Sequence, residues 1–295
     1  MPLVYACVAP HGHVIPQLSS PADLRRFRVT RQAMRRLARD VKAARPDTIV
    51  VATPHNLRLR GQIGVVTAAH TSGYLVSGAS GFALTRLARG RTRVQLHVES
   101  DVAFANALLN AAAARRLPVI GANYGTAEGP VSDMPMDWGT MVPLWFLLKE
   151  TRLPARVVVV TPSREIPLRQ NVRFGEVIAD VATRDRRRIV FVASADHAHA
   201  HKPSGPYGFS PAAAQYDAQM VKAIESGDLD AVLRLSPRLV DRAKPDSLWQ
   251  VAMLAGVTRR LGLRGELYSY EVPAYYGMIC AAFRGEGRGE RRDRA

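Results

Sequence analysis

Histidines gather at the ends of three hydrophobic segments of this 295-residue sequence. The segments span residues 3–9, 48–53 and 188–195, and each has the apolar, β-branched composition of a buried strand. Six of the eight histidines follow these segments: His11, His13, His55, His197, His199 and His201. A single histidine at a strand end is usually a hydrogen-bonded loop residue. Three strand ends that each carry histidine indicate metal binding or acid–base chemistry, because imidazole nitrogen serves both.

A carboxylate would complete a metal site of this kind. Two imidazoles and one carboxylate leave positions open on an octahedral ion for a substrate and O2. Asp246, in the segment KPDSLW before the last long predicted helix, is the candidate. An aspartate at that place is equally expected to cap the helix, because its side chain can accept from the first backbone N–H groups. Asp196 and Glu128 are the alternatives.

Short apolar runs alternate with longer helical stretches, which is typical of β-α-β units around a mainly parallel sheet. Strands are predicted at 3–9, 48–53, 62–68, 94–98, 155–162, 188–195 and 265–272. Helices are predicted at 21–45, 101–116, 140–151, 168–184, 209–226 and 245–261. In open α/β sheets, ligands bind beyond the carboxyl ends of the strands. We therefore expect a single α/β domain with a mainly parallel central sheet flanked by helices, and a metal site at the strand carboxyl ends.

The composition favours one domain, because 295 residues with 47% hydrophobic content can bury one large core. We expect residues 1–283 to form this domain and the glycine-rich, charged residues 284–295 to form a mobile tail. No apolar run reaches the roughly eighteen residues of a membrane span, and the first residues do not resemble an export signal. The protein is therefore expected in the cytoplasm, with no membrane partner. Cys7 and Cys280 lie in apolar runs, so no structural disulfide is expected.

The formal net charge of +16 raises nucleic acid as a partner, because clustered basic residues gain affinity by releasing phosphate counterions. The densest basic cluster lies within 25–39 and consists of arginines on one predicted helix, with only Phe27 among them to stack on a base. A solvated helix face accounts for this cluster. Nucleic acid is not the expected partner, and a basic nucleic-acid binder stays as an alternative.

An ordered series of motifs resembles a known family. The series is PHG after the first strand, TPHN after the second, GANYGT, PMDWGTMVPLWFL, ADHAHAHKPSGPYGF, AKPDSLWQ and a closing YYGM. This order is similar to that of the class III extradiol ring-cleavage dioxygenases, the superfamily of the protocatechuate 4,5-dioxygenase catalytic subunit. The resemblance runs from about residue 3 to residue 283.

The resemblance implies roles for particular residues. His11 and His55 match the two iron-ligand histidines, and His199 matches the active-site histidine that takes a proton from a substrate hydroxyl. The third ligand of the family is usually glutamate, and the matching stretch here offers Asp246, which is one methylene shorter. Side chains expected to contact the substrate lie in the loops at the strand ends: Asn56, Tyr124, Tyr207 and His201.

One position departs from the family pattern. Many relatives have Asp-His-Gly before Val-Pro-Leu, with the histidine as a proton donor, whereas this chain has Trp138 at that place. Tryptophan cannot shuttle a proton. That role is therefore vacant, or is filled by His13, His197 or His201.

The resemblance implies a non-heme Fe(II) dioxygenase of aromatic compound catabolism, with Mn or Zn as other possible metals. The expected substrates are a small aromatic diol, catechol-like or aminophenol-like, and O2. A homo-oligomer is expected, and a small partner subunit stays open. A hydrolase that uses Zn or Mn to activate water is the main alternative, since it would also need histidine and aspartate at strand ends. A non-catalytic member of the same fold is a further alternative.

Overall fold

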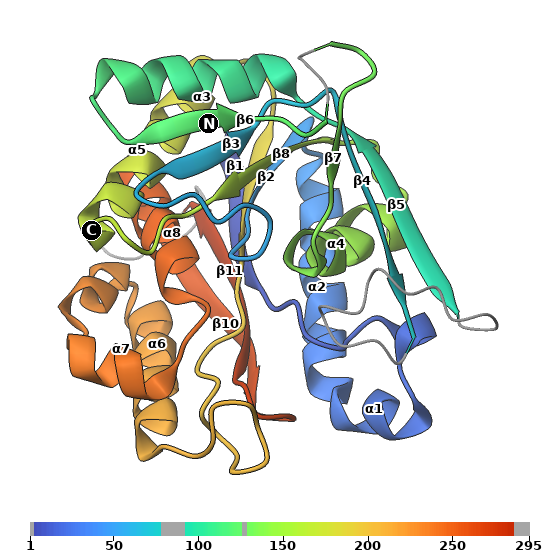
Figure 1. Ribbon diagram of the computed structural model, residues 1–295, viewed down its shortest axis with the longest axis vertical. Coiled ribbons are helices and arrows are strands. Elements are labelled where there is room, and N and C mark those ends of the chain that lie inside the picture. The colour runs from blue at the N-terminus through green and yellow to red at the C-terminus, as the bar shows by residue number, and fades with distance from the viewer. Residues whose placement is uncertain (1–2, 78–91, 126–128, 286–295) are drawn as a thin grey trace, which may run out of the picture.

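The computed structural model describes residues 3–77, 92–125 and 129–285 (Figure 1). Eight strands form the central sheet in the order β10-β11-β1-β9-β2-β8-β3-β6. Their bounds are β1 Leu3–Ala9, β2 Thr48–Ala52, β3 Ile63–Val66, β6 Val119–Ala122, β8 Arg156–Thr161, β9 Ile189–Ser194, β10 Leu263–Glu271 and β11 Met278–Gly285. This is the expected α/β fold with helices on both sides of a large sheet.

The four middle strands, β1, β9, β2 and β8, are parallel to one another. Side chains of these strands are buried on both faces, which explains why their sequences are nearly continuous apolar runs. Their carboxyl ends lie at one edge of the sheet. The loops that follow these four strands therefore meet there.

Alternate residues of each middle strand belong to two separate cores. On β1, Leu3, Ala6 and Val8 pack on one face, and Tyr5, Cys7 and Ala9 pack on the other. The first face is covered by α3 (Val102–Ala114), α5 (Leu168–Arg184), α6 (Pro211–Ser226) and α8 (Leu248–Leu261), with α7 (Pro237–Ala243) beside them (Figure 1). The second face is covered by α2 (Arg28–Ala44), α4 (Trp138–Leu144) and the π-helical turn η3 (Trp145–Glu150). Two short elements, η1 (Pro16–Leu18) and α1 (Pro21–Arg26), precede α2, and η4 (Leu229–Arg234) follows α6.

Two glycines allow α5 and α8 to approach closely. A Cβ atom added to Gly175 would lie 1.9 Å from the carbonyl oxygen of Met253, and one added to Gly256 would lie 2.0 Å from that of Val172. No side chain fits at either position. The close crossing fixes α8 against α5, and Asp246 lies directly before the N-cap residue of α8.

Three strands form a smaller second sheet in the order β5-β4-β7. They are β4 (His70–Val76), β5 (Arg93–Glu99) and β7 (Asp133–Pro135). The strand predicted at 94–98 therefore exists, but it pairs antiparallel with β4 rather than joining the central sheet. Strand β3 of the central sheet is antiparallel to β8, so the sheet is mixed toward this edge.

The arginines of α2 lie largely on its exposed side, and two of them pair with acidic side chains. Arg35 pairs with Glu150 at 2.9 Å and Arg36 with Glu266 at 2.6 Å. Within the described ranges, no helix combines the length and the apolar character that crossing a membrane would require. The part of the predicted tail at 286–295 lies outside the described residues, as does Glu128.

Candidate metal centre

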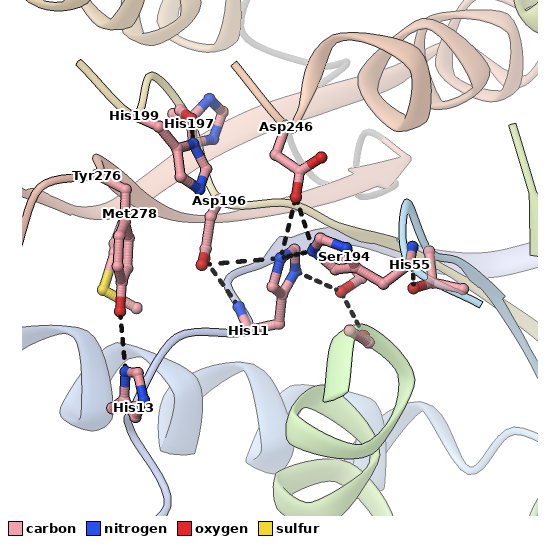
Figure 2. Close-up of polar contacts among 12 residues, drawn as sticks. His11, His13, His55, Ser194, Asp196, His197, His199, Asp246, Tyr276 and Met278 are labelled. Atoms are coloured by element: carbon pink, nitrogen blue, oxygen red, sulfur yellow. Dashed lines mark hydrogen bonds and ion pairs between the residues drawn. The ribbon is translucent and has the colours of Figure 1, made fainter. Parts of the chain in front are cut away.

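His11 lies two residues beyond β1, buried, with its ring held at one nitrogen (Figure 2). Its Nδ1 lies 3.0 Å from Ser194 Oγ, and the Ser194 hydroxyl donates to the carbonyl of Gly139 at 2.5 Å. Since the hydroxyl hydrogen is already used, Ser194 Oγ accepts from Nδ1–H. This tautomer leaves the lone pair on Nε2, as a metal-ligating histidine requires.

His55 follows β2 in the same way that His11 follows β1. Its ring stacks on the indole of Trp138, with ring centroids 4.1 Å apart and an interplanar angle of 30°. Thr53, between the strand and His55, donates its hydroxyl to Asp137 at 2.8 Å. The loop is thereby tied to the start of α4, which carries Trp138.

Asp246 reaches this edge of the sheet from the beginning of α8. Pro245 forms a β-bridge with Ala198, so the segment before the helix runs along the loop that follows β9. The N-cap residue of α8 is Ser247, and the carboxylate of Asp246 turns toward the histidines instead of capping the helix. Burial acts to raise the pKa of Asp246, but contacts with His11 and His55 outweigh it and hold that pKa well below its usual range.

Three ligand atoms converge at this point. His11 Nε2 and His55 Nε2 lie 3.1 Å apart, and Asp246 Oδ2 lies 2.7 Å from His55 Nε2 and 3.6 Å from His11 Nε2. Atoms bound to one ion at about 2.1 Å, with angles near 90°, lie roughly 3 Å apart. His11, His55 and Asp246 therefore form a group that can hold one metal ion.

Asp196 lies next to this group but has a different partner. Its Oδ1 accepts from the backbone N–H of His11 at 2.9 Å, and its Oδ2 is 3.7 Å from His11 Nε2. Burial acts to lower the pKa of His11, but the carboxylates of Asp196 and Asp246 outweigh burial and raise it. Asp196 thus orients the loop that carries His11 and places negative charge near the His11 ring.

His199 lies beside the group, with one ring nitrogen committed (Figure 2). Its Nδ1–H donates to the carbonyl of His197 at 2.7 Å, which leaves Nε2 as the basic nitrogen. Tyrosine rings surround it at centroid distances of 6.0 Å for Tyr207, 5.7 Å for Tyr275 and 5.4 Å for Tyr276. Burial lowers the pKa of His199.

The neighbouring histidines of this segment have other surroundings. His197 is fully buried, and neither of its ring nitrogens has a hydrogen-bond partner in the part of the chain that the structure describes. Burial lowers its pKa to about 4. His201 Nε2 lies 2.8 Å from Asp217 Oδ2, and Asp217 also accepts from Tyr270 and from the backbone of Ala198. This buried aspartate anchors the segment that carries His199.

The remaining predicted residues lie at varied positions. His13 is exposed, and its Nδ1 lies 3.3 Å from the hydroxyl of buried Tyr276. Asn56 donates to the carbonyl of Pro135 at 2.9 Å. The side chains of Tyr124 and Tyr207 are 63% and 57% exposed, and Tyr207 is the one whose ring faces His199.

The structure adds residues that the sequence analysis did not name. Arg164 follows β8 and donates to Asp246 Oδ1, while Ser194 and Asp217 hold His11 and the His199 segment. The sequence contained a signal for Arg164, since a Thr-Pro pair occurs at the end of β8 as it does directly after β2. Ser194 and Asp217 had none, because serine in a strand and aspartate in a helix are common.

Two proteins are similar to this chain, one in sequence and one in structure. Protein CA_C1420 of Clostridium acetobutylicum is 22% identical over 262 residues, which cover 89% of this chain and 53% of that protein. The chain thus spans about half the length of this curated relative. The crystal structure of the uncharacterized protein JW3007 from Escherichia coli K12 is 15% identical, covers 95% of this chain and 99% of that one, and superposes with a TM-score of 0.60. That likeness supports the fold.

A family match covers nearly the whole domain. Residues 5–280 match the family described as the catalytic LigB subunit of aromatic ring-opening dioxygenase. The matched range contains β9, β2, β8 and most of β1, together with the metal-ligand group and His199. The chain therefore belongs to the LigB family of aromatic ring-opening dioxygenase catalytic subunits.

Proposed function

We propose that this protein is a non-heme Fe(II)-dependent extradiol dioxygenase that opens the ring of a catechol-like or aminophenol-like substrate with O2. The observation that carries the proposal is the convergence of His11 Nε2, His55 Nε2 and Asp246 Oδ2, which all lie within 3.6 Å of one another. Two histidines with one carboxylate are the donor set of non-heme Fe(II) oxygenases, and they leave one face of the ion open.

Bound iron would supply the redox chemistry that allows O2 to react with an aromatic ring. The chain's own residues hold the substrate and move its protons. His199 is the proposed base, because its Nδ1–H is fixed on the His197 carbonyl and its Nε2 is left to accept a hydroxyl proton. The pKa of His199 is lowered by burial, so the neutral, accepting form predominates near neutral pH.

A proton donor must replace the histidine that many relatives have at the position of Trp138. We assign this role to His13 acting through Tyr276. His13 is exposed and can exchange protons with water, and its Nδ1 lies 3.3 Å from the Tyr276 hydroxyl. Gly12 makes room for this contact, since a Cβ there would lie 2.5 Å from the same hydroxyl. His197 and His201 fit less well, because His197 is fully buried and His201 is bonded to Asp217.

The substrate is proposed to lie between the metal-ligand group and the tyrosines around His199. Tyr207 is half exposed and faces His199, so it can pack on an aromatic ring that enters from solvent. Asn56, Tyr124 and His201 are proposed as further contacts.

Two other functions compete with this one. The ligand distances also suit a tetrahedral Zn²⁺ that activates water, which favours a hydrolase as the second enzyme. Trp138 favours a non-catalytic member, because it removes the proton donor found at that place in many relatives.

Oxygen consumption distinguishes these functions. The protein is loaded anaerobically with Fe(II), mixed with catechols and aminophenols in turn, and followed with an oxygen electrode and by absorbance. The proposal expects O2 uptake with a new yellow product for at least one compound, and loss of both in His199→Ala. Hydrolysis of esters or phosphates by a zinc-loaded protein without O2 uptake would favour the hydrolase. Iron binding without any turnover would favour the non-catalytic member.

A further inference from the structure

Arg164 links the carboxylate of the metal-ligand group to the end of a fourth strand. It lies three residues beyond β8, the parallel neighbour of β2. Its guanidinium donates to Asp246 Oδ1 and lies over the indole of Trp249, 4.4 Å from the ring centroid. The Arg164 side chain is 27% exposed and that of Asp246 is 9% exposed, so water screens their attraction only in part.

The two oxygens of Asp246 have separate partners. Oδ2 faces the imidazoles of His55 and His11, at 2.7 and 3.6 Å, whereas Oδ1 is taken by Arg164. The backbone on both sides is fixed as well. Asp246 N–H donates to the His197 carbonyl at 3.4 Å, and the Gln250 amide donates to the Asp246 carbonyl at 2.7 Å. The carboxylate group can then still rotate about its Cβ–Cγ bond. The hydrogen bond from Arg164 to Oδ1 prevents this rotation.

Trp249 keeps Arg164 in this position. It stands in the first turn of α8, and its ring packs against the core cluster beneath the sheet. A flat guanidinium stacked on an indole loses little further freedom when it donates to a carboxylate. The hydrophobic core therefore holds Trp249, Trp249 holds the guanidinium of Arg164, and Arg164 holds the carboxylate of Asp246.

We propose that Arg164 is a positioning residue that holds Asp246 as a one-oxygen metal ligand. This inference rests on the proposed metal site. If Oδ1 were free, both oxygens could turn to the ion and occupy two of its positions. With Oδ1 on Arg164, the two histidines and one oxygen of Asp246 would hold the ion and would leave positions open for the substrate oxygens and O2. Asp246 is shorter than the glutamate of the family, so the direction of its carboxylate matters more.

Co(II) titration tests this role without turnover. The wild-type protein, Arg164→Met and Arg164→Lys are titrated anaerobically with Co(II), and affinity and the visible spectrum are recorded. Arg58→Met is the matched control, because Arg58 lies on the loop after His55 and pairs with Glu165 at 3.7 Å rather than with a ligand atom. Thermal melting of each protein without metal shows whether it is folded.

The expected result is a loss of Co(II) affinity of about 10- to 100-fold in Arg164→Met, as is usual when a partner of a metal ligand is removed. The visible absorbance should also weaken, because a second carboxylate oxygen raises the coordination number. Arg164→Lys should recover part of both signals, and Arg58→Met should behave as wild type.

Equal affinity and an unchanged spectrum in Arg164→Met would overturn the inference. So would a variant that differs only in KM for carboxylated diols, because this would assign Arg164 to substrate binding. A wild-type protein that binds no Co(II) would overturn both this inference and the proposed function. Tight Co(II) binding that depends on Arg164, with no O2 uptake by the iron-loaded protein, would leave this inference standing and reject the proposed function alone.

Discussion

Trp138 covers the ring of His55, with the two ring centroids 4.1 Å apart. The tryptophan occupies the place where many family members have a proton-donating histidine, and here it packs on a metal-ligand candidate instead. Gly139, next to it, comes so close that an added Cβ would lie 2.5 Å from Thr53 Oγ1 and 3.3 Å from His55 Cδ2. The beginning of α4 therefore fits tightly around the His55 ring.

Replacing Trp138 tests whether this packing orients His55. An aromatic pair contributes about 1 kcal/mol, or roughly fivefold in affinity. Trp138→Ala should weaken metal binding by about this factor, whereas Trp138→Phe should keep most of the affinity because a ring remains. Competition with a chelator of known affinity measures both. Identical metal affinities in wild type and Trp138→Ala would show that the stacking has no such role.

Ser194 is expected to fix the tautomer of His11. Ser194→Ala removes the acceptor of His11 Nδ1–H and the donor to the Gly139 carbonyl, all in a buried place. Metal affinity should fall by about 10- to 100-fold. The free energy of unfolding without metal should fall by about 1–3 kcal/mol, because buried polar groups lose their partners. Ser163→Ala is a comparison at another buried serine, which lies two residues after β8, and its metal affinity should not change. Retention of full affinity in Ser194→Ala would remove Ser194 from the site.

His197 predicts a pH dependence of stability. Burial lowers its pKa to about 4 in the folded protein, and unfolding returns that pKa to about 6.5. Between these two values the unfolded chain binds more protons than the folded chain, so the free energy of unfolding falls as the pH is lowered. The contribution is about 3 kcal/mol over the whole window, present above pH 6.5 and lost by about pH 4.

His197→Leu should remove this contribution. Its free energy of unfolding at pH 7 should be close to that of wild type, because no hydrogen bond of the His197 ring is lost within the described residues. Urea unfolding at several pH values measures the difference between the two proteins. A difference that stays constant from pH 7 to pH 4 would contradict the low pKa of His197.

The sequence was informative where strands are buried and parallel. β1, β2 and β9 are continuous apolar runs, so their ends, and with them His11, His55 and His199, could be placed at one edge before any coordinates. The family match over residues 5–280 agrees with the resemblance seen in the motifs. Asp246 could be named as the carboxylate candidate from its place before a helix, but the sequence could not separate a ligand from a cap, because an aspartate at that place is as often a cap.

Contacts between segments that are distant in the sequence could not be predicted from hydrophobic patterns. β4, β6, β7 and β11 were not among the predicted strands. β4 and β6 are only partly buried, and β7 has three residues. The histidines at 197, 199 and 201 alternate regularly in sequence, yet one is buried without partners, one faces the tyrosines and one pairs with Asp217. Contacts with Tyr275 and Asp217 distinguish these histidines, and those contacts depend on the tertiary structure.

Iron stoichiometry in matched variants tests the central claim most directly. Wild type, His11→Ala, His55→Ala and Asp246→Ala are dialysed anaerobically against Fe(II), and bound iron is measured per folded chain. The account predicts one iron per chain in wild type and almost none in each variant, with native melting behaviour of the metal-free proteins. Stoichiometric iron retained by His11→Ala and His55→Ala would contradict it.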